Sequence, residues 1–192
     1  MEQHNHHKAA IYQWHQLIQE ACEYAGIELD PEIQSYLLLT LMRYIDDDQL
    51  AENAITMKLS NKEFRSREER LEDLKSTAEH CLILAGLFPS HIDRQFLRIS
   101  HYIQLGTDSY RELSAMVYDN DKMIYKKLST DFIKLVDVLY TIRIFNGSPK
   151  LPLLQAIELW SDTGSKLAYQ TLTLNRQSIP LSETFLEQAY KH

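Results

Sequence analysis

Four potentially cationic side chains recur at helical spacing on an otherwise acidic chain: His91, Arg94, Arg98 and His101 stand at i, i+3, i+7 and i+10. In a helix they would share one face, which we call the basic stripe. Arginine binds carboxylates through two parallel hydrogen bonds, and histidine titrates near neutral pH. The stripe therefore predicts a docking face for an acidic partner or a small anion. The alternative is an ordinary exposed face neutralised by acidic neighbours such as Asp93.

A second spacing joins two phenols across a glycine. Tyr102, Gly106 and Tyr110 stand four residues apart. In a continuous helix the two tyrosines would flank a gap and line a ligand groove. If the helix breaks at Gly106, they would pack around a corner. Structural packing is favoured, because buried tyrosines commonly combine an apolar ring with one satisfied hydroxyl.

Several other chemistries lack the residues that they require. No glycine-rich phosphate-binding motif occurs, and two isolated cysteines cannot form a structural zinc site. His4, His6 and His7 could bind a transition metal weakly, but a polar tail is the favoured interpretation. We therefore predict no metal and no cofactor, and we expect the chain to fold in the presence of a chelator.

The segment 84–113 carries a resemblance. It reads LAGLFP at 84–89, then SHY at 100–102, then Gly106-x-x-x-Tyr110-x-x-Leu113. This pattern resembles a family of uncharacterised bacterial all-helical proteins, in which a Gly-Leu-Phe-Pro stop precedes a Tyr-x-x-x-Gly-x-x-x-Tyr helix. The resemblance implies a bacterial cytoplasmic origin and transfers no site residue.

Composition predicts an all-α protein. The chain has 192 residues, of which 44% are hydrophobic and 24% charged, with only 5 Gly and 5 Pro to form turns. A net charge of −7 opposes binding to nucleic acid. The longest apolar stretch, 36–42, is too short to span a membrane, and no signal peptide is visible. Cys22 and Cys81 lie in helical apolar patterns, which favours reduced core thiols in a cytoplasmic protein.

Helix starts and stops can be placed along the first half of the chain. We predict helices over 8–24, from Pro31 to about 46–48, over 49–59, and over 60–85. Gly26 should end the first, and Asp30 should cap the second. Ser60 with Glu63 forms a capping-box pattern, and Gly86 is the expected left-handed stop of the fourth.

The second half predicts a central helix. A helix should restart at Ser90 and break at Gly106, although a continuous helix with close packing at Gly106 is the alternative. The segment 122–145 is apolar on nearly all sides, with Lys134, Asp137 and Thr141 on one polar strip, and should be the buried centre. A turn at 146–149, a helix over 153–174 kinked at Gly164, and a last piece after Pro180 complete the chain.

We therefore predict a single helical domain over 1–192, a compact bundle of about eight helices with a flexible tail at 1–7 and a C-terminal appendage at 176–192. No catalytic set is assembled, which favours a non-enzymatic interaction or adaptor module whose partner is another protein. The alternative is a bundle that binds a small apolar ligand or cofactor near Tyr102 and Tyr110, which could be an enzyme. A preformed pocket of several hundred Å³ beside the tyrosines would favour the alternative.

Overall fold

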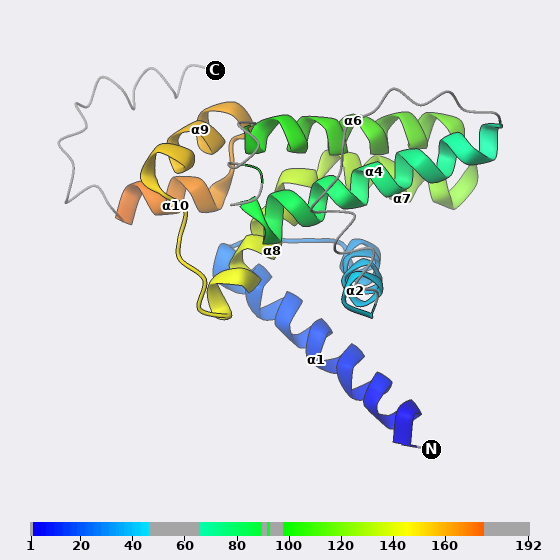
Figure 1. The fold of residues 1–192 in the computed structure, drawn as a ribbon, viewed down its shortest axis with the longest axis horizontal. Helices are drawn as coiled ribbons and strands as arrows, with labels where there is room; N and C mark the ends of the chain where they lie inside the picture. Colours follow the sequence, from blue (N-terminus) through cyan, green and yellow to red (C-terminus); the bar gives the residue numbers. More distant parts are fainter. Residues whose placement is uncertain (1, 47–65, 90–91, 93–97, 175–192) are drawn as a thin grey trace.

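The computed structural model describes residues 2–46, 66–89, 92 and 98–174. These residues form eight helices and no strand, which confirms the all-α prediction (Figure 1). The helices are α1 (Glu2–Ala25), α2 (Pro31–Asp46), α4 (Arg67–Leu87), α6 (Ile99–Met116), α7 (Asp119–Thr130), α8 (Phe132–Phe145), α9 (Leu153–Thr163) and α10 (Lys166–Leu174). The predicted helix over 49–59, the restart at Ser90 and the appendage at 176–192 lie outside the described residues.

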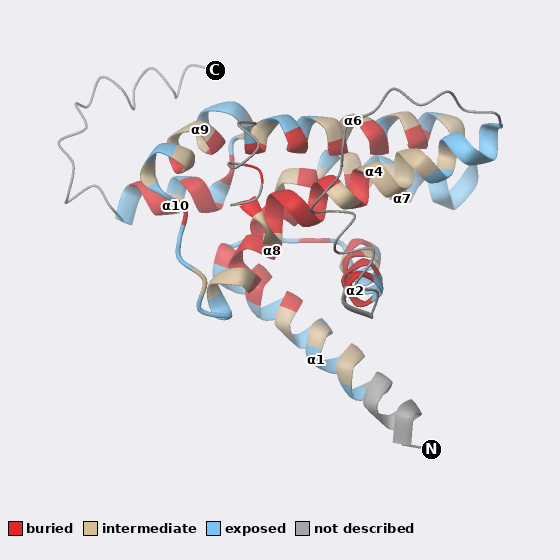
Figure 2. Cartoon of the chain, in the orientation of Figure 1, coloured by how far each residue is buried: buried red, intermediate tan, exposed pale blue. Residues whose placement is uncertain are grey.

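One hydrophobic core joins all eight helices, and α8 lies at its centre. Nine of the fourteen residues of α8 are buried, including the polar Asp137 and Thr141. Figure 2 shows the buried residues gathered where α1, α4 and α8 meet. The helix apolar on nearly all sides is thus the central one, as its pattern predicted.

The start of that central helix was predicted wrongly, because 122–145 forms two helices. The chain turns at Asp131, whose φ is −97° and ψ is 11°. Its backbone N–H donates to the Lys127 carbonyl and ends α7, while its own carbonyl accepts from Leu135. No glycine or proline marks this turn, and apolar residues continue through it, so periodicity alone could not reveal the break.

The first two helices follow their sequence signals at three of four ends. α1 ends before Gly26, which adopts a φ of +62°, and α2 begins at Pro31. The predicted start at Lys8 is wrong, because α1 already begins at Glu2. Residues 2–7, expected as a tail, form the first turns of this helix.

Ser66 caps the start of α4. Its Oγ accepts a hydrogen bond from the Glu69 N–H at 3.1 Å, in the manner of an N-cap. The predicted start at Ser60 is therefore wrong, since the helix begins at Arg67; Ser60 and Glu63 lie outside the described residues.

Gly86 does not end α4, which contradicts the predicted left-handed stop. The helix continues to Leu87, and Gly86 is buried within it. A Cβ at this position would lie 2.5 Å from the Cβ of Leu139 on α8. Glycine is needed here because α8 packs too closely against α4 to leave room for a side chain.

Gly106 likewise lies inside a continuous helix, so the predicted break is wrong. α6 runs unbroken from Ile99 to Met116. A Cβ on Gly106 would lie 2.2 Å from Cζ of Phe132 and 3.0 Å from Cβ of Cys81. The alternative prediction, a continuous helix that is closely packed at Gly106, is confirmed. The group that packs closest to Gly106 is the Phe132 ring.

The C-terminal helices are held against α8 by a buried carboxylate. The turn at 146–149 is confirmed, with Gly147 at a φ of +80°, but 153–174 is two helices separated at Gly164, whose φ is +70°. Asp137 on α8 accepts hydrogen bonds from Ser165 Oγ at 2.6 Å and from the Lys166 N–H at 2.9 Å. It therefore caps α10 from a different helix.

Candidate functional site

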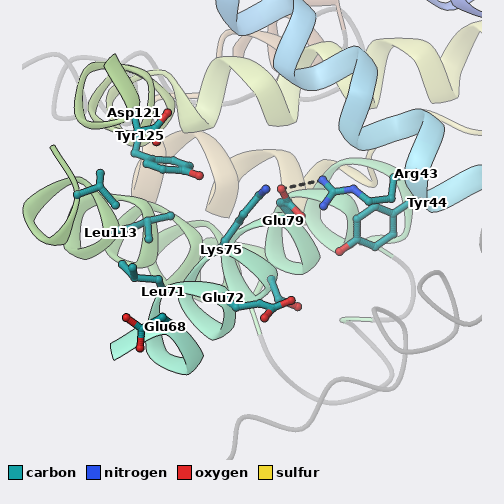
Figure 3. Close-up of a pocket in the computed structure, with 12 residues that line it drawn as sticks. Arg43, Tyr44, Glu68, Leu71, Glu72, Lys75, Glu79, Leu113, Asp121 and Tyr125 are labelled. Carbon is teal, nitrogen blue, oxygen red and sulfur yellow. Dashed lines mark hydrogen bonds and ion pairs between the residues drawn. The ribbon is translucent and has the colours of Figure 1, made fainter. Parts of the chain in front are cut away.

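A pocket of about 580 Å³ lies between α2, α4, α6 and α7 (Figure 3). One face of α4 lines the pocket. Its lining residues are spaced three and four apart, so they project from the same side of the helix. The lining residues from α4 are Glu68, Leu71, Glu72, Lys75, Ser76 and Glu79. Arg43 and Tyr44 come from the end of α2 and Leu113 from α6. Val117 directly follows α6, and Asp121 and Tyr125 belong to α7.

A buried carboxylate forms the innermost polar group of this pocket. The Glu79 side chain is only 3% exposed, and two hydrogen-bond donors from α2 hold it in place. Tyr36 Oη donates to Glu79 Oε1 at 2.6 Å, and Arg43 Nη2 donates to the same oxygen at 2.9 Å. The guanidinium balances the charge of the carboxylate, which a buried anion requires.

A second phenol extends this hydrogen-bond chain into the core. Tyr110, which is fully buried, donates through Oη to Tyr36 Oη at 3.4 Å. The Tyr110 ring also stacks on Tyr125, with ring centroids 6.0 Å apart and planes inclined by 18°. The chain Tyr110, Tyr36, Glu79 and Arg43 thus links α6, α2 and α4 behind the pocket.

The phenols of this cluster remain protonated at neutral pH. Burial raises the pKa of Tyr36, and the neighbouring Tyr110 and Glu79 raise it further. Burial followed by the charge of Glu79 raises the pKa of Tyr44 and of Tyr110 in the same direction. These hydroxyls are therefore neutral hydrogen-bond donors rather than bases.

The outer lining carries more negative than positive charge. Glu68, Glu72 and Asp121 are exposed carboxylates that make no ion pair with a described residue. Lys75 is the cation opposite them, half-buried and without a salt bridge to a described residue. In Figure 3 the Lys75 side chain extends into the pocket, and its amine ends between the side chains of Tyr125 and Glu79.

The basic stripe does not form one continuous helical face. His91 and Arg94 lie outside the described residues. Arg98 is the N-cap of α6 and has extended backbone, with a φ of −82° and a ψ of 145°, so the helical register stops between it and His101. Arg98 Nη1 lies 3.6 Å from Asp162 Oδ2, and His101 is exposed. The carboxylate that neutralises Arg98 is thus Asp162 on α9, and the spacing of residues along the sequence did not predict this pair.

The predicted groove along Tyr102, Gly106 and Tyr110 is filled. Tyr102 and Tyr110 are 1% and 0% exposed, and the Phe132 ring occupies the space over Gly106. The prediction of a groove at this place is wrong, and that of structural packing is confirmed. Tyr110 nevertheless lies behind the pocket through its contacts with Tyr36 and Tyr125.

Glu79 and its two partners, Tyr36 and Arg43, were not predicted from the sequence. A signal was present, because Glu79 stands among the apolar residues Ala78, Cys81 and Leu82 of the predicted helix over 60–85. A carboxylate in such a stripe requires a partner. The identity of that partner could not be read from the chain, because Tyr36 and Arg43 are 43 and 36 positions away.

Among the described residues, no group of three His, Cys, Asp or Glu side chains is placed to hold a metal ion, and the side chains of His4, His6 and His7 are not among those described. No helix within the described ranges combines the length and the apolar character that crossing a bilayer requires.

Comparisons of the chain with protein-family models, with curated proteins and with solved structures each give no match. The resemblance of 84–113 to a bacterial helical family stays a prediction. The function has therefore to be inferred from the pocket and its residues.

Proposed function

We propose that this protein binds a small organic molecule in the pocket between α2, α4, α6 and α7. The observation that carries the proposal is a cavity of about 580 Å³ whose inner end is a fixed, buried carboxylate. Small-molecule sites typically have volumes of roughly 300–1,000 Å³ and combine apolar walls with a few polar groups. Leu71, Leu113 and Val117 provide apolar walls here.

The arrangement supports binding rather than catalysis. Glu79 Oε1 already accepts hydrogen bonds from Tyr36 and Arg43, which hold the carboxylate as a fixed acceptor at the inner end of the pocket. Since burial keeps the phenols protonated, none of them supplies a nucleophile. The pocket supports the alternative function expected from the sequence, but its described lining does not include the predicted groove residues Tyr102, Gly106 and Tyr110.

The interaction or adaptor module remains a prediction without a described surface in its favour. Large apolar side chains that are exposed are distributed over α1, α2, α7, α8, α9 and α10. We retain the bacterial cytoplasm as the expected compartment, which is supported by the resemblance of 84–113 and by the two buried free thiols, Cys22 and Cys81.

Native mass spectrometry of the protein purified from its own host tests the proposal. We expect the intact protein to carry an additional small mass. Leu71→Trp places a large ring in the pocket and should abolish that mass, whereas Leu154→Trp, on the exposed face of α9, should retain it. A wild-type protein without added mass, or equal retention in both folded variants, would contradict the proposal.

A further inference from the structure

The charges that line the pocket do not cancel. Among the described residues, four carboxylates line it, from Glu68, Glu72, Glu79 and Asp121, against two cations, Arg43 and Lys75. The Arg43–Glu79 ion pair, at 2.9 Å, is neutral as a unit. Three described carboxylates then remain against one amine, which gives the described lining a net charge of −2. The whole chain carries −7, so the long-range field has the same sign.

The phenols leave that balance unchanged and supply aromatic surface. Burial raises the pKa of Tyr125, and the charges of Asp121 and Glu79 raise it further, so the ring stays neutral. Tyr125 is held in place by stacking on Tyr110 and by an edge contact with Tyr36. A fixed neutral phenol attracts a cation placed over its ring, whereas it offers an anion no comparable face.

We infer that the pocket selects small organic cations, in which an ammonium group is joined to an apolar or aromatic body. This inference rests on the proposed function and adds the chemical class of the ligand. The ammonium group would lie near Asp121, which stands beside Tyr125 in Figure 3, and the body against Tyr125, Leu113 and Leu71. An anionic ligand would meet three carboxylates that form no ion pair with a described residue, and Arg43 is already engaged by Glu79.

Three probes of nearly equal shape test this inference: 2-phenylethylamine, 2-phenylethanol and phenylacetate. Their binding to the full-length protein is measured by isothermal titration calorimetry at low and at moderate salt. We expect the amine to bind at least about tenfold more tightly than the alcohol, since Asp121 acts at short range and the surplus charge of the described lining has the same sign, and phenylacetate to bind most weakly. Added salt should weaken binding of the amine more than that of the alcohol.

Charge variants give effects of opposite sign. Asp121→Asn should weaken binding of the amine about three- to tenfold, and Lys75→Gln should strengthen it by a similar factor. Binding of 2-phenylethanol should be unchanged in both. Asp162→Asn, which removes an exposed carboxylate of α9 outside the pocket, is the matched control and should leave all three affinities unchanged. Thermal melting of each variant confirms that it is folded.

The outcomes separate the two proposals. Binding of the alcohol or the acid at least as tight as that of the amine, sensitive to Leu71→Trp, would overturn the cation preference while the small-molecule pocket stands. An amine preference unaffected by Asp121→Asn and Lys75→Gln would also overturn it, because the preference would then arise elsewhere. Binding of none of the three probes would contradict both the ligand class and the proposed pocket.

Discussion

Glu79 organises its surroundings because a buried carboxylate needs hydrogen-bond donors in place of the water that it has lost. Its Oε1 accepts from Tyr36 and Arg43, which come from a helix far away in the sequence. Hydrogen bonds to a charged group stabilise a fold by about 1.5–3 kcal/mol, more than those between neutral groups. Tyr36 has a double role, since it also accepts from Tyr110.

Tyr36→Phe should therefore lower the free energy of unfolding by about 2–3 kcal/mol, because it removes the Glu79 donor and leaves the buried Tyr110 hydroxyl without this acceptor. Urea unfolding measures the change. Tyr12→Phe, at a side chain 70% exposed, is the control and should have no effect. A loss below about 0.5 kcal/mol for Tyr36→Phe would show that water replaces the phenol at Glu79.

At the scale of elements, glycines were the least reliable signals in the chain. Gly26 and Gly147 adopt positive φ where the sequence predicted a stop or a turn. Gly86 and Gly106 lie inside helices, where the reason for glycine is a neighbouring side chain. Periodicity and capping describe one helix at a time, whereas a close approach between two helices depends on tertiary packing.

Gly86→Ala should be destabilising for this packing reason. Alanine favours a helix by about 1 kcal/mol over glycine, but the new methyl would lie 2.5 Å from Cβ of Leu139, an atom fixed to the backbone of α8. We expect a net loss of about 2 kcal/mol, because α4 and α8 must move apart. Thermal unfolding of the variant gives the value, and equal or higher stability would show that the two helices separate freely.

Gly106→Ala tests which neighbouring side chain leaves no room for a methyl group at position 106. Its methyl would meet the far end of the Phe132 ring, at Cζ and Cε2, instead of a Cβ. The cost of Gly106→Ala should therefore decrease by about 1 kcal/mol or more when Phe132→Leu removes those atoms, as a double-mutant cycle would report. Additive losses would mean that Cys81, at 3.0 Å, limits the space instead.

At the scale of the whole molecule, the sequence predicted the class, the core and the central helix, but not how the helices meet. The apolar stripes of single helices face inward, and a chain with few glycines and prolines folds as long helices. The pocket depends on Tyr36, Arg43 and Glu79 coming together from two helices, which no spacing within one segment encodes. The ion pair between Arg98 and Asp162 shows the same limit on the surface.

The polar strip of the central helix makes the stability of the whole protein depend on pH. Asp137 is 2% exposed, and burial raises its pKa from 3.8 to about 6, although hydrogen bonds from Ser165 and from the Leu167 and Lys166 N–H groups oppose the rise. A carboxyl with a raised pKa keeps its proton in the folded protein while the unfolded chain has already released it. Its contribution is therefore most favourable at low pH and is lost as the pH rises from about 4 to about 6.

Asp137→Asn isolates this contribution, since an amide does not titrate and can still accept from the start of α10. Between about pH 4 and about pH 7, the unfolding free energy of the wild type should fall relative to that of Asp137→Asn by roughly 2–3 kcal/mol. Asp162→Asn, at an exposed carboxylate, should show no such difference. Chemical denaturation across this range measures all three proteins. A difference that grows in the opposite direction would mean that the hydrogen bonds from α10 outweigh burial and hold the Asp137 carboxylate ionised.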